Sequence, residues 1–451
     1  MQAQVLVLDF GSQFTQLIAR RVRELGVYSE IRACTTKPDQ IDRSGLKAIV
    51  LSGGPASVTS ADAPVFDEQW LETGIPVLGI CYGMQLIANH FGAELVSGAS
   101  REYGYSTCLV QNNTTLFDGF EKGENTPIWM SHGDHVESIP NGFDLLGSSP
   151  GAPHAAIGCD AQKIFGVQFH VEVAHTPRGK DILGNFLFKI ADCRKDWTSS
   201  GFISESVKRI SREVSAGGNV ICGLSGGVDS TVAAVLVAKA LGDRLHCIFV
   251  DNGLLRKDEK QQVMQALSSA ELGLQITAVD GESRFLSALK GVSDPEEKRK
   301  IIGRVFIEVF EEQAEKIDNV THLVQGTLYP DVIESVSVRG PSATIKTHHN
   351  VGGLPERMNL KLIEPLRELF KDEVRRIGGE LAIPVELLNR QPFPGPGLAV
   401  RILGDITPER LKILREADQI FHDEIAAEGL YHSLWQSFAV LLPIQSVGVM
   451  G

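Results

Sequence analysis

The sequence lacks several features that would each point to a class of protein. It has no basic leader before a long apolar segment and no uninterrupted apolar run of membrane-spanning length, which predicts a cytosolic protein. Its net charge of -13 lacks the cation excess of nucleic-acid or anionic-membrane binders. Its seven cysteines include no C-x-x-C pair, which indicates buried thiols rather than a disulfide framework or a zinc knuckle.

A further absence concerns the stretch GLSGGVDST, residues 223–231. It lies between the apolar run NVICGL and the helix-like run VAAVLVAKALG, so glycines at a strand-to-helix turn would direct backbone N–H groups at an anion. No lysine follows these glycines, and the Walker pattern G-x-x-x-x-G-K-[ST] is not met. The stretch therefore predicts a phosphate site of another kind.

Strand-like and helix-like runs alternate along two successive blocks of the 451 residues. This alternation predicts an α/β fold with two successive doubly wound, mainly parallel sheet domains. The polar run ADCRKDWTSSGF suggests a boundary, and RQPFPGPGLAV is a stiff connector because its prolines and glycines do not suit a helix. We expect domains at residues 1–192 and 204–389, a linker at 193–203, and an incomplete C-terminal α+β domain at 390–451.

Cys81 is the cysteine whose setting suggests chemistry. In PVLGICYGMQLIANHF, an apolar strand ends at Gly79-Ile80-Cys81-Tyr82-Gly83 and a helix begins, as in a nucleophile elbow with cysteine in place of serine. The start of a helix favours the thiolate, which is the reactive form. A buried structural cysteine is the alternative, and the G-x-C-x-G spacing favours the nucleophile.

A base for this thiol is expected in IFGVQFHVEV, residues 164–173. If the whole run is a strand, alternation places His170 and Glu172 on one side, so Glu172 orients the ring that takes the Cys81 proton. After the strand KAIVL, a glycine amide of Ser52-Gly53-Gly54 and the N–H of Tyr82 could stabilise an oxyanion, although a plain glycine turn explains this segment equally well.

These residues resemble the class I glutamine amidotransferases, whose motifs DFGSQ, LSGGP, GICYGMQ, SHGD and GVQFHVEV occur here in the family's order. The resemblance implies that Cys81 attacks the side-chain amide of glutamine and releases ammonia, with Gly54, Tyr82 and Gln85 at the oxyanion and glutamine site. Residues 103–105 and 131–134 match segments near that pocket, although sequence alone makes them ordinary loops. Val171 stands where the family usually has proline.

The stretch SGGVDS resembles the pyrophosphate loop of the N-type ATP pyrophosphatases, which cleave ATP between the α and β phosphates. The resemblance implies that the loop binds the departing pyrophosphate and that Asp229 helps to bind Mg²⁺, a hard cation suited to carboxylate oxygens. Asp251 in FVDNG would lie near the nucleotide, and a turn-capping role is equally plausible for it. The implied ATP-binding residues are Ser225, Gly226, Gly227, Val228, Asp229, Ser230, Thr231 and Asp251.

Nearly the whole chain resembles the glutamine-hydrolysing GMP synthase family, through segments such as QGTLYPDVIES, HHNVGGLP, LFKDEVR, PFPGPGL and LPIQSVGVMG. The resemblance implies that MgATP adenylates XMP and that ammonia displaces AMP. Arg299, Lys346, His348 and His349 become candidate contacts for XMP, against the plainer interpretations of a solvated helix face at Lys298-Arg299-Lys300 and a mobile loop at 346–350. Gln391 replaces the histidine expected before PFPGPG.

The run PIQSVGVMG is apolar to its last residue, which predicts that the chain stops inside a domain. In the resembled family a further segment completes a homodimerisation domain, so dimerisation and turnover would be affected. Three hypotheses follow. The first is glutamine-dependent synthesis of GMP, the second is an amidotransferase acting on another adenylated acceptor, and the third is a truncated fragment that retains only glutaminase activity or nucleotide binding.

Overall fold

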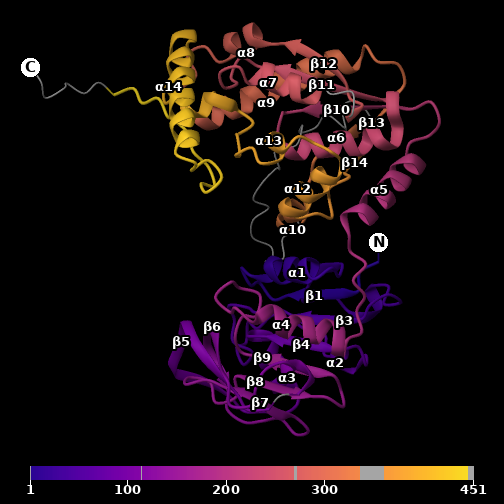
Figure 1. Ribbon diagram of the computed structural model, residues 1–451, viewed down its shortest axis with the longest axis vertical. Helices are drawn as coiled ribbons and strands as arrows, with labels where there is room; N and C mark the ends of the chain where they lie inside the picture. Colours follow the sequence, from indigo (N-terminus) through magenta and orange to yellow (C-terminus); the bar gives the residue numbers. More distant parts are fainter. Residues whose placement is uncertain (1, 113, 269–271, 336–359, 445–451) are drawn as a thin grey trace, which may run out of the picture. The chain divides into compact units, whose positions relative to one another are not determined.

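The computed structural model describes residues 2–112, 114–268, 272–335 and 360–444. The described residues form two compact units, residues 2–201 and residues 202–335 with 360–444 (Figure 1). In the described part of the chain, no helix is both long and apolar enough to cross a membrane. The predicted domain limits remain predictions. The first residues of the predicted linker pack on the first unit, where the Trp197 ring stacks on Tyr28 with centroids 4.7 Å apart.

The first unit is built on a nine-stranded sheet in the order β2-β1-β3-β4-β9-β8-β7-β5-β6. Strands β2, β1, β3, β4 and β9 pair in parallel, whereas the pairs from β9 through β8, β7 and β5 to β6 are antiparallel. The sheet is therefore mixed. Its strands are β1 (Val5–Asp9), β2 (Ser29–Ala33), β3 (Ala48–Leu51), β4 (Val77–Ile80), β5 (Leu95–Val110), β6 (Asn125–Val136), β7 (Asp144–Ser148), β8 (Ala156–Cys159) and β9 (Ile164–Val167).

The inner parallel strands are mostly apolar because helices cover such a sheet on both sides, whereas the edge strand β2 is only partly buried. Every residue of β1, β3, β4 and β9 is buried. The helical segments of this unit are α1 (Thr15–Glu24), η1 (Pro38–Gln40), α2 (Gln69–Glu72), α3 (Tyr82–His90), η2 (Thr115–Phe117), α4 (Gly179–Asn185) and η3 (Phe186–Ile190). All seven cysteines of the chain are free and buried, as predicted.

The second unit contains a five-stranded, all-parallel sheet in the order β12-β11-β10-β13-β14. Its strands are β10 (Asn219–Leu224), β11 (Leu245–Asp251), β12 (Gln275–Asp280), β13 (Val320–Val324) and β14 (Lys361–Ile363). Its helices are α5 (Ser199–Glu213), which begins in the first unit, α6 (Val228–Leu241), η4 (Gly242–Arg244), α7 (Glu259–Leu267), α8 (Glu282–Ala288), α9 (Pro295–Ala314), α10 (Tyr329–Ser335), α12 (Lys371–Glu380), α13 (Val385–Leu388), η6 (Gly397–Arg401) and α14 (Pro408–Ala427). The predicted α/β class is confirmed.

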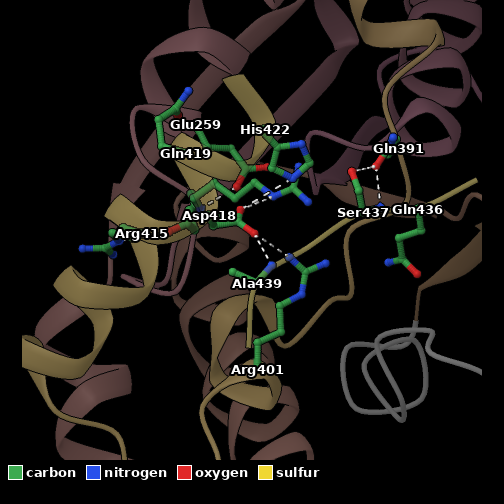
Figure 2. A network of polar contacts seen from close by, with 12 residues as sticks. Glu259, Gln391, Arg401, Arg415, Asp418, Gln419, His422, Gln436, Ser437 and Ala439 are labelled. Atoms are coloured by element: carbon green, nitrogen blue, oxygen red, sulfur yellow. Dashed lines mark hydrogen bonds and ion pairs between the residues drawn. The ribbon is translucent and has the colours of Figure 1, made fainter. Parts of the chain in front are cut away.

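Helix α14 is joined to the preceding connector by a buried polar network (Figure 2). The carboxylate of Asp418, 1% exposed, lies 3.2 Å from Arg256 Nε and 3.6 Å from Arg401 Nη1, and it accepts the Ala439 N–H at 3.0 Å. In the same region, both ends of the Gln391 side-chain amide form hydrogen bonds. Its Oε1 accepts from the N–H and the hydroxyl of Ser437, each at 2.8 Å, and its Nε2 donates to Tyr431 O at 2.9 Å. Gln391 therefore fastens the chain around residue 437 through its amide.

Candidate active sites

The first candidate site is the turn between β4 and α3, which has the geometry of a nucleophile elbow. Cys81 has φ 53° and ψ -106°, a conformation that a non-glycine residue rarely adopts. A Cβ on Gly79 would lie 2.5 Å from the carbonyl carbon of Gly83, and a Cβ on Gly83 would collide with Leu51 O. The G-x-C-x-G spacing is therefore required by close backbone approach on both sides of the cysteine.

The thiol of Cys81 is 4% exposed and lies beside the predicted base. His170 Nδ1 is 2.7 Å from Glu172 Oε1, and the two residues are 3% and 0% exposed. Burial lowers the pKa of His170, but hydrogen bonds with Cys81 and Glu172 raise it, and the net pKa is about 10. The imidazolium form of His170 is therefore stabilised next to the sulfur, as suits a base that takes a proton from a thiol.

The predicted strand through residue 173 is wrong, although the residues that it was meant to align do meet. Strand β9 ends at Val167, and beyond it the Gln168 N–H bonds Ala155 O at 2.8 Å while the His170 N–H bonds Trp129 O at 3.0 Å. The Thr176 hydroxyl donates to His170 O at 2.7 Å, and Arg21 Nε donates to Glu172 O at 2.8 Å. Loop hydrogen bonds, rather than strand alternation, hold the histidine and glutamate together.

The segments expected as loops near the pocket are strands. Tyr103 pairs with Ser131 in the antiparallel ladder of β5 and β6. Ser131 O lies 3.5 Å from Cys81 Sγ, and His132 Nε2 lies 3.3 Å from Glu102 Oε2. The pairing of β5 with β6 thus places a backbone carbonyl beside the thiol. The SHGD motif alone does not indicate this contact.

Of the predicted oxyanion residues, Gly54 packs against Phe10 and Tyr82, since an added Cβ would lie 2.9 Å from Phe10 O and 3.3 Å from Tyr82 Cγ, and its neighbour Gly53 faces the thiol. A Cβ on Gly53, the neighbour of Gly54, would lie 3.7 Å from Cys81 Cβ and 3.2 Å from His170 Cε1. Tyr82 is the first residue of α3, so its N–H has no acceptor within the helix. The Nε2 of Gln85 donates to Asp134 O at 2.8 Å and to Gln168 Oε1 at 3.3 Å.

The second candidate site is the turn between β10 and α6, where the polar groups of the predicted phosphate loop bond to one another. Ser225 Oγ is 3.0 Å from Ser230 Oγ and accepts the Gly227 N–H at 3.2 Å, while Thr231 Oγ1 donates to Gly227 O at 2.9 Å. Gly226 has φ 74°, and Val228 begins α6. The loop presents hydroxyls and the N-terminus of a 14-residue helix, which is a favourable place for an anion.

Lys371, a residue that the sequence did not single out, brings a positive charge beside the residues of this loop. Its Nζ forms an ion pair with Asp229 Oδ2, although the two residues are 142 positions apart. Lys371 lies in LFKDEVR at the first position of α12. Asp229 Oδ1 is buried without a hydrogen-bond partner in the described part of the chain. The proximity of Lys371 to Asp229 follows from the packing of α12 beside α6 and cannot be seen in the sequence.

The remaining predicted contacts differ in their surroundings. Asp251 accepts the Gly253 N–H at 3.0 Å and pairs with Lys260 at 3.0 Å, so it caps its turn at the end of β11. Arg299 is exposed and lies 3.1 Å from Glu296. Lys346, His348 and His349 lie outside the described residues.

The interpretation of Lys298-Arg299-Lys300 as a solvated helix face is wrong for Lys298. This side chain is 0% exposed, and its Nζ donates to Ala399 O at 3.1 Å, Ile402 O at 2.7 Å and Gly404 O at 2.6 Å. An ammonium is tolerated there because backbone carbonyls satisfy all three of its hydrogens. Lys298 thus fastens α9 to the segment after PFPGPG.

Both half-sites match known families. The class I glutamine amidotransferase family matches residues 6–190, and the NAD synthase family matches residues 201–301. A chain with an amidotransferase unit followed by an ATP pyrophosphatase-type unit belongs to the class of glutamine-dependent ligases that activate an acceptor with ATP. Its membership within that class follows from its relatives.

The GMP synthase [glutamine-hydrolyzing] of Nitratidesulfovibrio vulgaris is 55% identical over 100% of this chain and 87% of its own. That of Chlorobium chlorochromatii is 59% identical over 99% of this chain and 87% of its own. A glutamine amidotransferase structure from Thermotoga maritima is 18% identical, covers 43% of this chain and 99% of its own, and gives a TM-score of 0.35. The chain belongs to the glutamine-hydrolysing GMP synthase family.

Proposed function

We propose that this chain makes GMP from XMP, glutamine and ATP, with ammonia produced by its first unit and used by its second. The observation that carries the proposal is the presence, in one chain of this family, of the Cys81–His170–Glu172 cluster and of a glycine–serine loop with a lysine beside it. The two chemistries are complementary, since an adenylated oxygen needs a nucleophile and the amidotransferase unit releases one.

In the glutamine half-reaction, Cys81 Sγ attacks the δ-carbonyl carbon of glutamine, and His170 gives its proton to the departing ammonia. The backbone N–H groups of Gly54 and Tyr82 stabilise the oxyanion. Water activated by His170 then cleaves the γ-glutamyl thioester, which releases glutamate and restores the thiolate. Gln85 Oε1 accepts no hydrogen bond from the described residues, so we assign it to the α-ammonium group of glutamine.

In the adenylation half-reaction, the loop from Ser225 to Thr231 binds the β and γ phosphates through its hydroxyls and through the backbone amides of Gly226, Gly227 and Val228. Lys371 supplies the positive charge that a Walker lysine supplies elsewhere. Asp251 lies at the end of β11, the strand beside β10, where open sheets bind nucleotides.

Asp229 fits a magnesium ligand, because its buried Oδ1 has no hydrogen-bond partner among the described residues and a carboxylate oxygen suits a hard cation. The described residues contain no cluster of three or more His, Cys, Asp or Glu side chains arranged for a metal. Phosphate oxygens and water would complete the coordination. When bound, the ion would neutralise charge on the phosphates.

For XMP, we retain Arg299 as a candidate contact, together with Lys346, His348 and His349. We also propose a cytosolic homodimer, as expected from the sequence and its resemblance.

A single assay tests the proposal. Purified chain is supplied with MgATP, XMP and either glutamine or ammonium, and GMP, AMP and pyrophosphate are followed together. Formation of all three in equal amounts supports the proposal. Replacing XMP by IMP or nicotinate adenine dinucleotide should give no product. AMP formation with another acceptor but not with XMP would reject the assignment of substrate.

A further inference from the structure

The register of two parallel strands places a glutamine beside the nucleophile. Gly79 pairs with Gly166 and Ile80 with Val167 in the ladder of β4 and β9, and the Cys81 N–H extends it by bonding Val167 O at 2.8 Å. The first residue after β9 therefore lies beside the turn that contains Cys81. That residue is Gln168, 0% exposed, whose Nε2 lies 3.6 Å from Cys81 Sγ.

The orientation of this amide follows from a chain of contacts that begins at a backbone carbonyl. Asp134 O can only accept, so the group of Gln85 that faces it at 2.8 Å must be Nε2. The second hydrogen of that nitrogen then points to the Gln168 side chain at 3.3 Å, which must present its oxygen. Gln168 consequently turns its NH₂ group toward the sulfur, and the reverse orientation would set two NH₂ groups against each other.

The neighbours of the sulfur distinguish its two protonation states. Ser131 O, 3.5 Å from Sγ, can accept a hydrogen bond from the thiol but has no hydrogen to donate to the thiolate. The Gln168 N–H is a donor, and a donor gains strength when its acceptor carries a charge. A hydrogen bond to the charged form of a group favours that form. The Gln168 contact is therefore strongest after Cys81 loses its proton.

We propose that Gln168 is a further catalytic residue of the glutaminase half-reaction, whose amide N–H stabilises the Cys81 thiolate. The proposal rests on the proposed function of Cys81. It assigns Gln85 Nε2 a positioning role, since this group fixes the Gln168 amide, while Gln85 Oε1 stays available to glutamine.

The hydrogen bond from Gln168 to the sulfur of Cys81 acts at two steps of the reaction. Before attack, it holds the thiolate that pairs with the His170 imidazolium. In thioester hydrolysis, water adds to the carbonyl carbon and gives its proton to His170, and the C–S bond then breaks with its electron pair passing to sulfur. The Gln168 N–H faces the atom on which that negative charge returns, so it assists the departure of the sulfur.

Other charged or titratable groups near the thiol come from the neighbouring elements. His170 and Glu172 follow β9, and His132 and Asp134 belong to β6. None of these is changed by substitution of Gln168. A purely structural glutamine would fill the same space without responding to the charge on sulfur, and this difference can be measured.

The test is the pH dependence of Cys81 alkylation by iodoacetamide in the full chain, without glutamine or nucleotides, followed by mass spectrometry of the peptide that contains Cys81. Gln168→Leu removes the donor, and we expect the midpoint of the rate profile to rise by about one pH unit, as for the loss of one hydrogen bond to a charge. Gln168→Glu keeps an acceptor for Gln85 but faces sulfur with a carboxylate, so its midpoint should rise further. The kcat of glutamine hydrolysis by Gln168→Leu should fall about tenfold with little change in KM.

The control is Gln111→Leu, which removes another glutamine amide contact of the first unit, 3.0 Å from Ser148 Oγ. It should keep the wild-type midpoint. Unchanged midpoints in folded Gln168→Leu and Gln168→Glu would overturn the proposal. If those variants do not fold, Gln85→Met decides, because it frees the Gln168 amide to rotate: an upward shift supports the proposal and an unchanged midpoint overturns it. Alkylation needs no substrate, so failure of the proposed GMP synthesis is detected separately.

Discussion

Cys81 and Ser225 each follow a buried parallel strand and precede a helix, but their side chains meet different surroundings. The Cys81 sulfur is buried among groups from other segments, which include Ser131 O at 3.5 Å and Gln168 Nε2 at 3.6 Å. Ser225 is exposed and bonds within its own loop, to Ser230 and Gly227. A nucleophile must be oriented before the substrate arrives, whereas a phosphate loop needs donors that it can release to a ligand.

The backbone shows the same contrast. Both turns require a positive φ, and in the phosphate loop it falls on Gly226, for which it has no steric penalty. In the elbow it falls on Cys81, which places about 1–3 kcal/mol of strain on the reacting residue. The surrounding contacts must hold that strain, so the elbow should tolerate change less well than the loop.

The largest expected effect is the loss of one half-reaction while the other is kept. Cys81→Ala should reduce glutamine-dependent GMP formation at least about 1000-fold, because no other group replaces the nucleophile. Ammonium-dependent formation should stay within about twofold of wild type, since the second unit carries the adenylation chemistry. Both rates are measured by GMP release, and an equal loss of both would contradict the assignment of ammonia production to the first unit alone.

The next effect concerns rigidity of the elbow. Gly83→Ala should destabilise the first unit by about 3 kcal/mol, since the new Cβ collides with Leu51 O and the backbone there cannot move freely. Gly184→Ala is the matched helical control, because its nearest atom would be 4.0 Å away, and it should be neutral or stabilising. Urea denaturation of both variants measures the difference, and equal stabilities would show that the elbow is not tightly packed.

A smaller effect depends on pH. The pKa of His170 is raised from 6.5 to about 10, so the stabilisation from its imidazolium contacts is fully present below pH 6.5 and is lost as the pH rises through 10. Glu172→Gln removes the charged partner, and it should lower the free energy of unfolding by about 2 kcal/mol at pH 6. The difference from wild type should shrink by pH 10.5. A difference that is constant with pH would mean that His170 is neutral in the folded chain.

The smallest expected effect concerns the phosphate loop. Lys371→Met should raise the KM for ATP about tenfold, because the loop loses the cation paired with Asp229. Lys257→Met is the control, since Lys257 pairs with Glu416 at 2.8 Å on an exposed surface and should leave the KM unchanged. Alkylation of Cys81 should be normal in both variants. A normal KM in Lys371→Met would remove this lysine from the phosphate site.

Much of the glutaminase site could be predicted from the sequence, because local patterns determine it. The spacing around Cys81 requires a turn between strand and helix, and His170 and Glu172 are only two residues apart, so they meet even though the predicted strand ends early at Val167. The α/β class likewise follows from the alternation of apolar runs.

The rest depends on contacts between distant segments. Lys371 reaches Asp229 across 142 positions, and Gln168 reaches the sulfur only through the register of β4 with β9. Lys298 looks solvated in the sequence because a charge run on a helix usually is, and only the carbonyls of residues 399–404 explain its burial. No spacing rule within a single segment contains such information.

The burial of Lys298 also makes it a reporter. Amine-reactive labels modify lysines according to their accessibility, so in a footprinting experiment Lys300 should react readily while Lys298 stays silent. Labelling of Lys298 under native conditions would then record each separation of α9 from the segment at 399–404, without substrates or any measurement of activity. The natural sequence thus contains its own probe of the contact between α9 and the connector, with no substitution needed.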